Sequence, residues 1–124
     1  MNTTSLHTAP GDGLPMPRRL GAVLAVAFGV GLSVLDSAIA NVALPTLGAE
    51  LAVSSADSIW IVNAYQLAIM VSVLPLAALG ETLGYRKIYV GGLALFTLAS
   101  AGCALAGSFA TLVLARVLQG FGAA

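Results

Sequence analysis

Charged residues are scarce in this sequence. Asp, Glu, Lys and Arg make up 8% of its 124 residues, whereas an ordinary soluble domain has about 25%. Because 59% of the residues are hydrophobic, a soluble globular fold is not expected. Five basic residues balance five acidic ones, and no basic stripe could neutralise the phosphates of a nucleic acid. We therefore exclude nucleic-acid binding.

Cysteine and histidine are almost absent. Cys103 and His7 are the only residues of their kinds, so the sequence contains neither an internal disulfide nor a cluster of metal ligands. It also lacks the G-x-x-x-x-G-K-[ST] loop that binds nucleotide phosphates. No nucleophile with a nearby base and no paired carboxylates lie in its apolar stretches. These absences predict a non-enzymatic protein without a cofactor or a metal ion.

The apolar stretches are long enough to cross a lipid bilayer. Three stretches of 23 to 30 residues contain no charge apart from Asp36. About 20 apolar residues in a helix cross a hydrocarbon core of about 30 Å. We expect three spans near residues 20–44, 57–79 and 88–107. A fourth apolar run, 111–124, has 14 residues and is too short to cross at about 1.5 Å per residue.

Basic residues flank these spans on one side. Arg18 and Arg19 precede the first span, and Arg86 and Lys87 separate the second from the third. The other two connections contain no Lys or Arg. Because cytoplasmic flanks collect positive charge, we expect a multi-pass protein of the cell membrane with a cytoplasmic N-terminus. Residues 1–17, rich in Pro, Gly, Thr and Ser, are predicted to form a disordered cytoplasmic tail before a transmembrane region, 18–124.

The first span also has features of a signal peptide. Arg18 and Arg19 precede an apolar run that ends in Ala38-Ile39-Ala40, an A-x-A type of cleavage site. Asp36 lies just before this site, where a signal peptide has small residues. The segment is also longer than the usual 15–30 residues of a signal peptide. We therefore favour a retained helix.

Two signals mark the second span. Ser54 to Asp57 resembles a capping box that opens this helix. Pro75 is expected to kink the helix near its cytoplasmic end. Both signals agree with a helix over residues 57–79.

Asp36 lies inside the first span. A charge there costs about 2.5–3.5 kcal/mol on insertion scales, so it should face protein or water. Gly29, Ser33, Ala40 and Ala43 share its helical face at spacings of three and four. This small, polar face is consistent with a packing stripe on which Asp36 pairs with a neighbouring span. It is also consistent with a carboxylate in a water-filled path that binds a proton or a cation.

Polar and aromatic residues gather near the outer end of the second span. Asn63 and Gln66 are three residues apart, and we expect them to point into the helix bundle. Trp60 and Tyr65 are typical of the aromatic belt at a membrane interface. Whether Asn63 and Gln66 contact a substrate stays open at this stage.

Arg116 is the second charge within an apolar run. Gln119, Gly120 and Ala123 share its helical face, which places a hydrogen-bonding amide and a close-packing patch beside the guanidinium. The arginine either extends to the outer interface or faces a cavity and pairs with a carboxylate.

Three segments resemble family motifs. Residues 35–45, LDSAIANVALP, are similar to L-D-x-T-x-x-N-V-A-L-P with Ala38 replacing threonine. Residues 77–87, AALGETLGYRK, are similar to a G-x-L-A-D-R-x-G-R-K loop, and residues 112–124, LVLARVLQGFGAA, match L-x-x-x-R-x-x-Q-G-x-G-A-A at every fixed position. Together they resemble the major facilitator superfamily of secondary transporters, in particular its fourteen-span drug:proton antiporter branch.

The resemblance implies an all-α membrane protein made of two six-helix bundles with a substrate path between them. This chain would supply the first four helices of the N-terminal bundle, with the fourth truncated. In the family, the residues equivalent to Arg116 and Gln119 face the central cavity and are associated with proton coupling. The candidate proton and substrate path comprises Asp36, Asn41, Asn63, Gln66, Arg116 and Gln119. The candidate gating loop, which would latch one conformation, comprises Glu81, Gly84, Arg86 and Lys87.

The favoured interpretation is the front of a longer transporter, or the product of a truncated gene. Its expected activity is proton-coupled export of small, lipophilic or drug-like molecules by alternating access. Its partners would be the lipid bilayer, a small-molecule substrate, protons and the remaining spans. The alternative is a membrane protein without transport activity that self-assembles through a small-residue face containing Ala99, Cys103 and Gly107.

Overall fold

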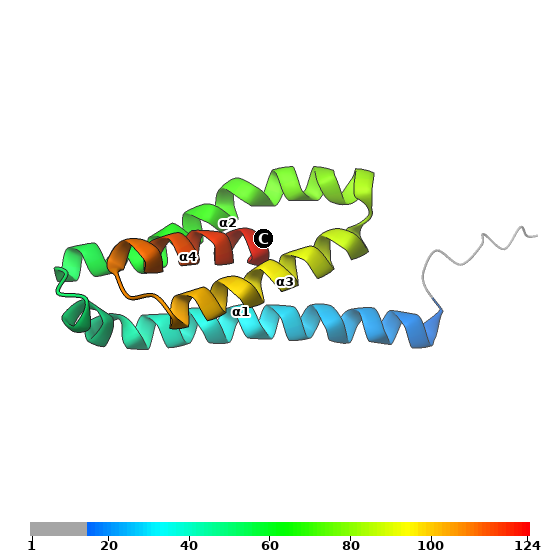
Figure 1. The fold of residues 1–124 in the computed structure, drawn as a ribbon. Helices are drawn as coiled ribbons and strands as arrows, with labels where there is room; N and C mark the ends of the chain where they lie inside the picture. The colour runs from blue at the N-terminus through cyan, green and yellow to red at the C-terminus, as the bar shows by residue number, and fades with distance from the viewer. Residues whose placement is uncertain (1–14) are drawn as a thin grey trace, which may run out of the picture.

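The structure is a computed structural model that describes residues 15–124, and all of its regular elements are helices. Figure 1 shows their arrangement. Three of them are long and apolar enough to cross a membrane, as the sequence predicts. The all-α fold class is thereby confirmed. The helices are α1 (Met16–Glu50), α2 (Ser55–Leu83), α3 (Tyr85–Ala104) and α4 (Phe109–Ala123).

Helix α1 begins earlier and ends later than the span expected at 20–44. Residues 1–14 of the predicted tail lie outside the described residues, but Met16 and Pro17 already belong to α1. A proline in the first turn lacks an N–H that would have no helical partner there. At the other end, α1 continues through Pro45 to Glu50. Part of the connection expected at 45–56 is therefore helical.

Helix α2 begins where the capping signal predicts. The Oγ of Ser54 accepts a hydrogen bond from the backbone N–H of Asp57 at 3.1 Å, and its hydroxyl donates to the Asp57 carboxylate at 2.7 Å. This cap satisfies a backbone donor that a helix start leaves unpaired. Helix α2 then continues through Pro75 to Leu83.

Residues 77–87, which resemble a loop of the family, are mostly helical, and the connection between the two helices is a tight turn. Only Gly84 separates α2 from α3. Its φ of 93° suits glycine, which has no Cβ to resist this conformation. The Tyr85 ring packs against Gly80, where an added Cβ would lie 2.6 Å from the ring. The turn between α2 and α3 is therefore tight.

Helix α4 also begins earlier than expected, at Phe109 instead of residue 111. Ser108 and Thr111 form a capping box in which each side chain accepts from the other residue's backbone N–H. This serine and threonine pair is the signal that sets the start of α4. Helix α3 correspondingly ends at Ala104, before the predicted 107.

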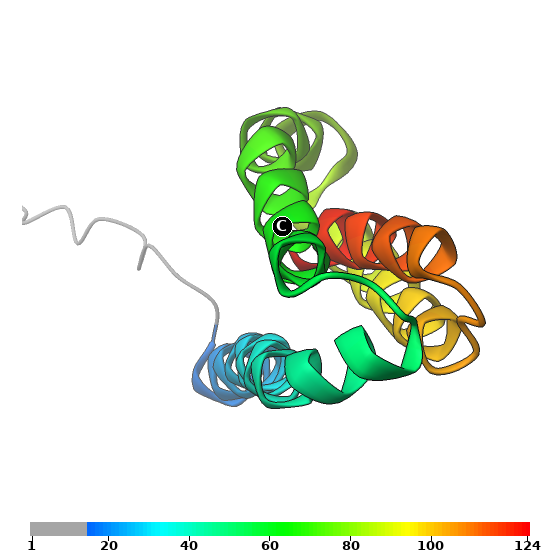
Figure 2. The ribbon, with the colours of Figure 1, turned by 90° about the vertical axis from the view of Figure 1, so that its left-hand side faces the viewer.

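The core lies among α2, α3 and α4, and α1 lies to one side of this group (Figure 2). Helix α1 packs mainly on α2, and the face predicted around Asp36 is half-buried. Most of the other apolar side chains of α1 are exposed. The buried hydrophobic residues are Ile61, Ala64, Tyr65, Ala68, Phe96, Ala99, Leu112 and Ala115.

Glycines bring α4 close to its neighbours. A Cβ on Gly120 would lie 2.6 Å from the Tyr65 carbonyl oxygen in α2, and one on Gly122 would lie 2.5 Å from the Phe96 nitrogen in α3. Small residues allow such approach between helices in membranes. The small-residue face considered for self-assembly is divided, because Ala99 is buried within the chain and Gly107 follows the end of α3.

We predict that Gly122→Ala destabilises the bundle, because its Cβ has no room beside the backbone of α3. Overpacking of this kind costs about 1–3 kcal/mol. The measurement is the unfolding temperature of the protein in detergent. Gly31→Ala is the matched control, since a Cβ at Gly31 meets nothing within 4 Å. Equal unfolding temperatures for the two variants would contradict the packing seen at Gly122.

Candidate functional site

Asp36 and Arg116 form an ion pair between α1 and α4. The Nη1 of Arg116 donates to the Oδ2 of Asp36 at 2.5 Å. The arginine side chain is 4% exposed and the aspartate side chain 24%. This is the only ion pair within residues 15–124. It shows that Arg116 pairs with a carboxylate in place of extending to the outer interface.

Gln119 joins both partners of the ion pair to α3. Its Nε2 donates to Asp36 Oδ1 and to Ser100 Oγ, both at 2.7 Å, and its Oε1 accepts from Arg116 Nη1 at 2.8 Å. Cys103 Sγ lies 3.5 Å from the same oxygen. Because Gln119 is fully buried, these bonds fix the orientation of its amide. We call Asp36, Arg116, Gln119 and Ser100 the polar cluster.

The guanidinium of Arg116 has further neutral contacts with α2. Its Nε donates to the Ile61 carbonyl at 3.4 Å, and its Cζ lies 4.6 Å from the centroid of the Tyr65 ring. Its Nη2 is buried without a hydrogen-bond partner among residues 15–124. The arginine is therefore held by one charged group and several neutral ones.

The polar cluster contains one carboxylate and one guanidinium. Asp36 is the negatively charged group of the cluster, and its side chain is 24% exposed. Protonation would remove the charge that Arg116 pairs with and would change what the carboxyl group can accept or donate. The contact between α1 and α4 thus depends on the charge of Asp36.

Three residues of the predicted path lie apart from the polar cluster. Asn41, Asn63 and Gln66 are exposed, although the sequence placed Asn63 and Gln66 inside the bundle. Trp60 is 52% exposed, as expected for a residue of an interfacial belt. Of the six path residues, the structure brings together Asp36, Arg116 and Gln119.

The predicted gating residues lie at the tight turn between α2 and α3. Glu81 belongs to the last turn of α2, while Arg86 and Lys87 belong to the first turn of α3. All three are exposed, and Glu81 forms no ion pair within the described part of the chain. Gly84 supplies the turn itself.

Sequence reasoning missed three residues of the site. Tyr65 is 2% exposed and lies against Arg116, so it is not a belt residue. Ser100 and Cys103 are three residues apart on α3 and both reach Gln119. Their spacing is the one signal that could have shown them on one helical face. No feature of the sequence indicates which element that face meets.

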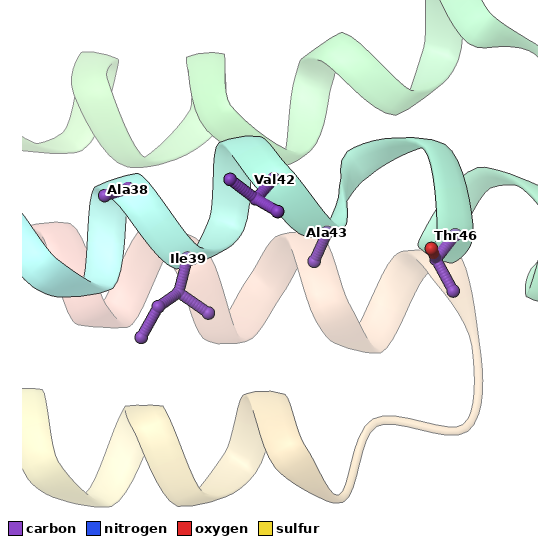
Figure 3. A pocket seen from close by; sticks show the side chains of 5 residues that line it. All are labelled: Ala38, Ile39, Val42, Ala43 and Thr46. Atoms are coloured by element: carbon purple, nitrogen blue, oxygen red, sulfur yellow. The ribbon is translucent and has the colours of Figure 1, made fainter.

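A shallow hollow lies on the surface of α1, next to the half of the helix that follows Asp36 (Figure 3). Ile39 and Val42 in its lining are 66% and 81% exposed. None of the polar-cluster residues lines this hollow, so it is separate from the site. Its lining consists of Ala38, Ile39, Val42, Ala43 and Thr46.

The sequence of these four helices matches a known protein family. Residues 26–124 match the profile of the Major Facilitator Superfamily. The chain belongs to that family. Its membership and its long apolar helices make it a multi-pass membrane protein.

Several curated relatives are similar to this member of the family. It is 55% identical over 113 residues to the uncharacterized transporter YebQ of Escherichia coli (strain K12). The aligned region covers 91% of this chain and 25% of YebQ. It is 44% identical over 121 residues to the tetracenomycin C resistance and export protein of Streptomyces glaucescens, covering 94% and 22%. It is 31% identical over 108 residues to the riboflavin transporter RibZ of Clostridioides difficile (strain 630), covering 87% and 24%. The chain thus spans about a quarter of these relatives.

We predict that Asp36→Asn lowers the unfolding temperature in detergent, because Arg116 then lacks its carboxylate. Removing one partner of a fully buried pair costs about 3–5 kcal/mol, and the partial exposure of Asp36 reduces this to about 1–3 kcal/mol. Asp36→Asn combined with Arg116→Met should recover part of the loss. A double variant whose loss equals the sum of the two single losses would contradict the pairing.

Proposed function

We propose that this chain forms the first four helices of an exporter that couples the outward movement of small molecules to protons. The remaining helices would complete the transport path. In this proposal Asp36 binds the proton, while Arg116 and Gln119 respond to its charge. The observation that carries the proposal is the polar cluster, in which the Asp36 carboxylate joins α1 to α4 and Gln119 joins α4 to α3.

The position of the carboxylate supports this role. A charged side chain within a membrane is expensive and marks an ion or proton route when it persists. Asp36 is partly exposed on its helix, while its partner Arg116 is buried. A proton that reaches Asp36 therefore acts on a contact between two helices, and alternating access requires such contacts to change.

The relatives support export of a lipophilic, drug-like cargo. One relative is named for resistance to and export of tetracenomycin C, and it covers 94% of this chain. Another is named a multidrug resistance protein, Stp of Mycobacterium tuberculosis (strain CDC 1551 / Oshkosh), at 40% identity. We extend this cargo class, and the antiport mechanism of the branch, to the present protein. The riboflavin transporter shows that related proteins also carry other cargo.

We further propose that the α2–α3 turn is cytoplasmic and acts as part of a gate. Arg86 and Lys87 lie at this turn, and Arg18 and Arg19 lie at the start of α1. Positive charge at both places favours the cytoplasmic side of the cell membrane. Glu81 is exposed at the same turn, where it is free to contact a cationic group on a moving neighbour.

Transport tests the role of Asp36 directly. Asp36→Asn in the complete transporter should abolish efflux of ethidium driven by a proton gradient in membrane vesicles, because asparagine cannot exchange a proton. Asp57→Asn is the matched control, since Asp57 is exposed and caps α2 away from the polar cluster. Proton-driven efflux by the Asp36→Asn protein at the rate of the Asp57→Asn control would refute proton binding at Asp36.

The orientation is tested by labelling in intact cells. After Cys103→Ser removes the native thiol, Ser55→Cys should react with a membrane-impermeant maleimide added outside. Thr82→Cys should react only after the cells are opened, because α2 crosses the membrane between these positions. The reverse pattern would show that the N-terminus lies outside.

A further inference from the structure

The contacts of Arg116 with α2 are independent of Asp36. In α2, the Ile61 carbonyl accepts from Nε and the Tyr65 ring lies 4.6 Å from Cζ. In α4, Gln119 Oε1 accepts from Nη1, while the Nε2 of the same amide donates to Asp36. None of these three groups carries a charge. The guanidinium therefore lies in a neutral cradle, defined as the Ile61 carbonyl, the Tyr65 ring and Gln119 Oε1, with Asp36 as its one charged neighbour.

The Tyr65 ring is buried against the guanidinium of Arg116. Tyr65 is 2% exposed, and its backbone carbonyl lies close to Gly120, where an added Cβ would be only 2.6 Å away. Gly120 follows Arg116 by one helical turn, so the close approach of α2 and α4 occurs next to the ring. The ring and the guanidinium therefore lie beside a close approach of α2 and α4.

A buried guanidinium needs such support whenever its carboxylate is neutral. Arginine remains protonated in proteins, so protonation of Asp36 leaves a positive charge within the membrane without an anion. Carbonyl oxygens and the face of an aromatic ring both present negative potential to a cation. The ring matters particularly here, because Nη2 of Arg116 has no hydrogen-bond partner among residues 15–124.

We infer that Tyr65 is a positioning residue that keeps Arg116 in place while Asp36 is neutral. Tyr65 contributes little to the stability of the bundle when the ion pair between Asp36 and Arg116 is formed, and more when that pair is broken. When Asp36 binds or releases a proton, the contact between α1 and α4 then changes, but the Arg116 side chain keeps its position. This role of Tyr65 rests on the proposed function, because it requires that Asp36 binds a proton. The contacts that define the cradle do not depend on that proposal.

The test is a double-mutant cycle in the complete protein, purified in detergent. Asp36→Asn represents the neutral state of Asp36. Tyr65→Met removes the ring while keeping much of its volume, and Tyr65→Phe, the matched control, keeps the ring face without the hydroxyl. The unfolding temperature of each variant is measured with and without Asp36→Asn.

We expect Tyr65→Met to lower the unfolding temperature by about 2 °C or more beyond its effect in the wild-type background when Asp36→Asn is present. Tyr65→Phe should show the same effect in both backgrounds, because a phenyl ring also binds a cation. Tyr65→Leu replaces the methionine variant if that protein cannot be purified. Equal losses for the non-aromatic variant in the two backgrounds would overturn the inference.

The cycle separates this inference from the proposed function. If Asp36→Asn retains proton-driven efflux, the proposed function fails whatever the cycle shows. If Asp36→Asn abolishes efflux but the cycle shows no coupling, the role of Tyr65 fails alone. Cys103 in α3 is the remaining titratable group that reaches the site, and Cys103→Ser in every variant excludes a contribution from its thiol.

Discussion

A buried positive charge within a membrane must be compensated where it lies, and the arrangement around Arg116 follows from this constraint. Arg116 is 3% exposed. Its guanidinium contacts a carboxylate from α1, a carbonyl and a ring from α2, and Gln119, which itself bonds to α3. Hydrophobic burial does not drive helices together inside lipid, so polar contacts of this kind give the bundle much of its specificity. The glycines of α4 permit the short distances that these contacts need.

Helix α1 differs from the other three in how it is attached. Most of its apolar side chains are exposed, and its long-range hydrogen bonds involve Asp36 and the Ala25 carbonyl, which accepts from Tyr89 at 2.5 Å. Helix α1 also packs on α2, so a change of charge at Asp36 would alter part of its attachment to the bundle. Asp36 is the acidic residue among these contacts, and the proposed proton site lies there for that reason.

The sequence predicted the fold class and singled out Asp36 and Arg116 as charges within apolar runs, because a long apolar helix and an intramembrane charge are both strong signals. It left open whether the two residues pair with each other. Helix ends were less accurate: Pro45 lies within α1, and the helices α2 and α3 extend into the segment between the expected spans, leaving Gly84 as the turn. Asn63 and Gln66 share a helical face as expected, yet that face is exposed. Tyr65 was missed because periodicity within one helix does not show which neighbour each face meets.

The most direct test of the central proposal is an infrared difference spectrum of the complete protein in lipid, recorded as the pH is lowered. A carboxyl group that takes up a proton gains a C=O stretching band. The account predicts a band in the wild-type protein that is absent from the Asp36→Asn variant and present in the Asp57→Asn variant. An identical band in the wild-type and Asp36→Asn proteins would show that the proton binds elsewhere.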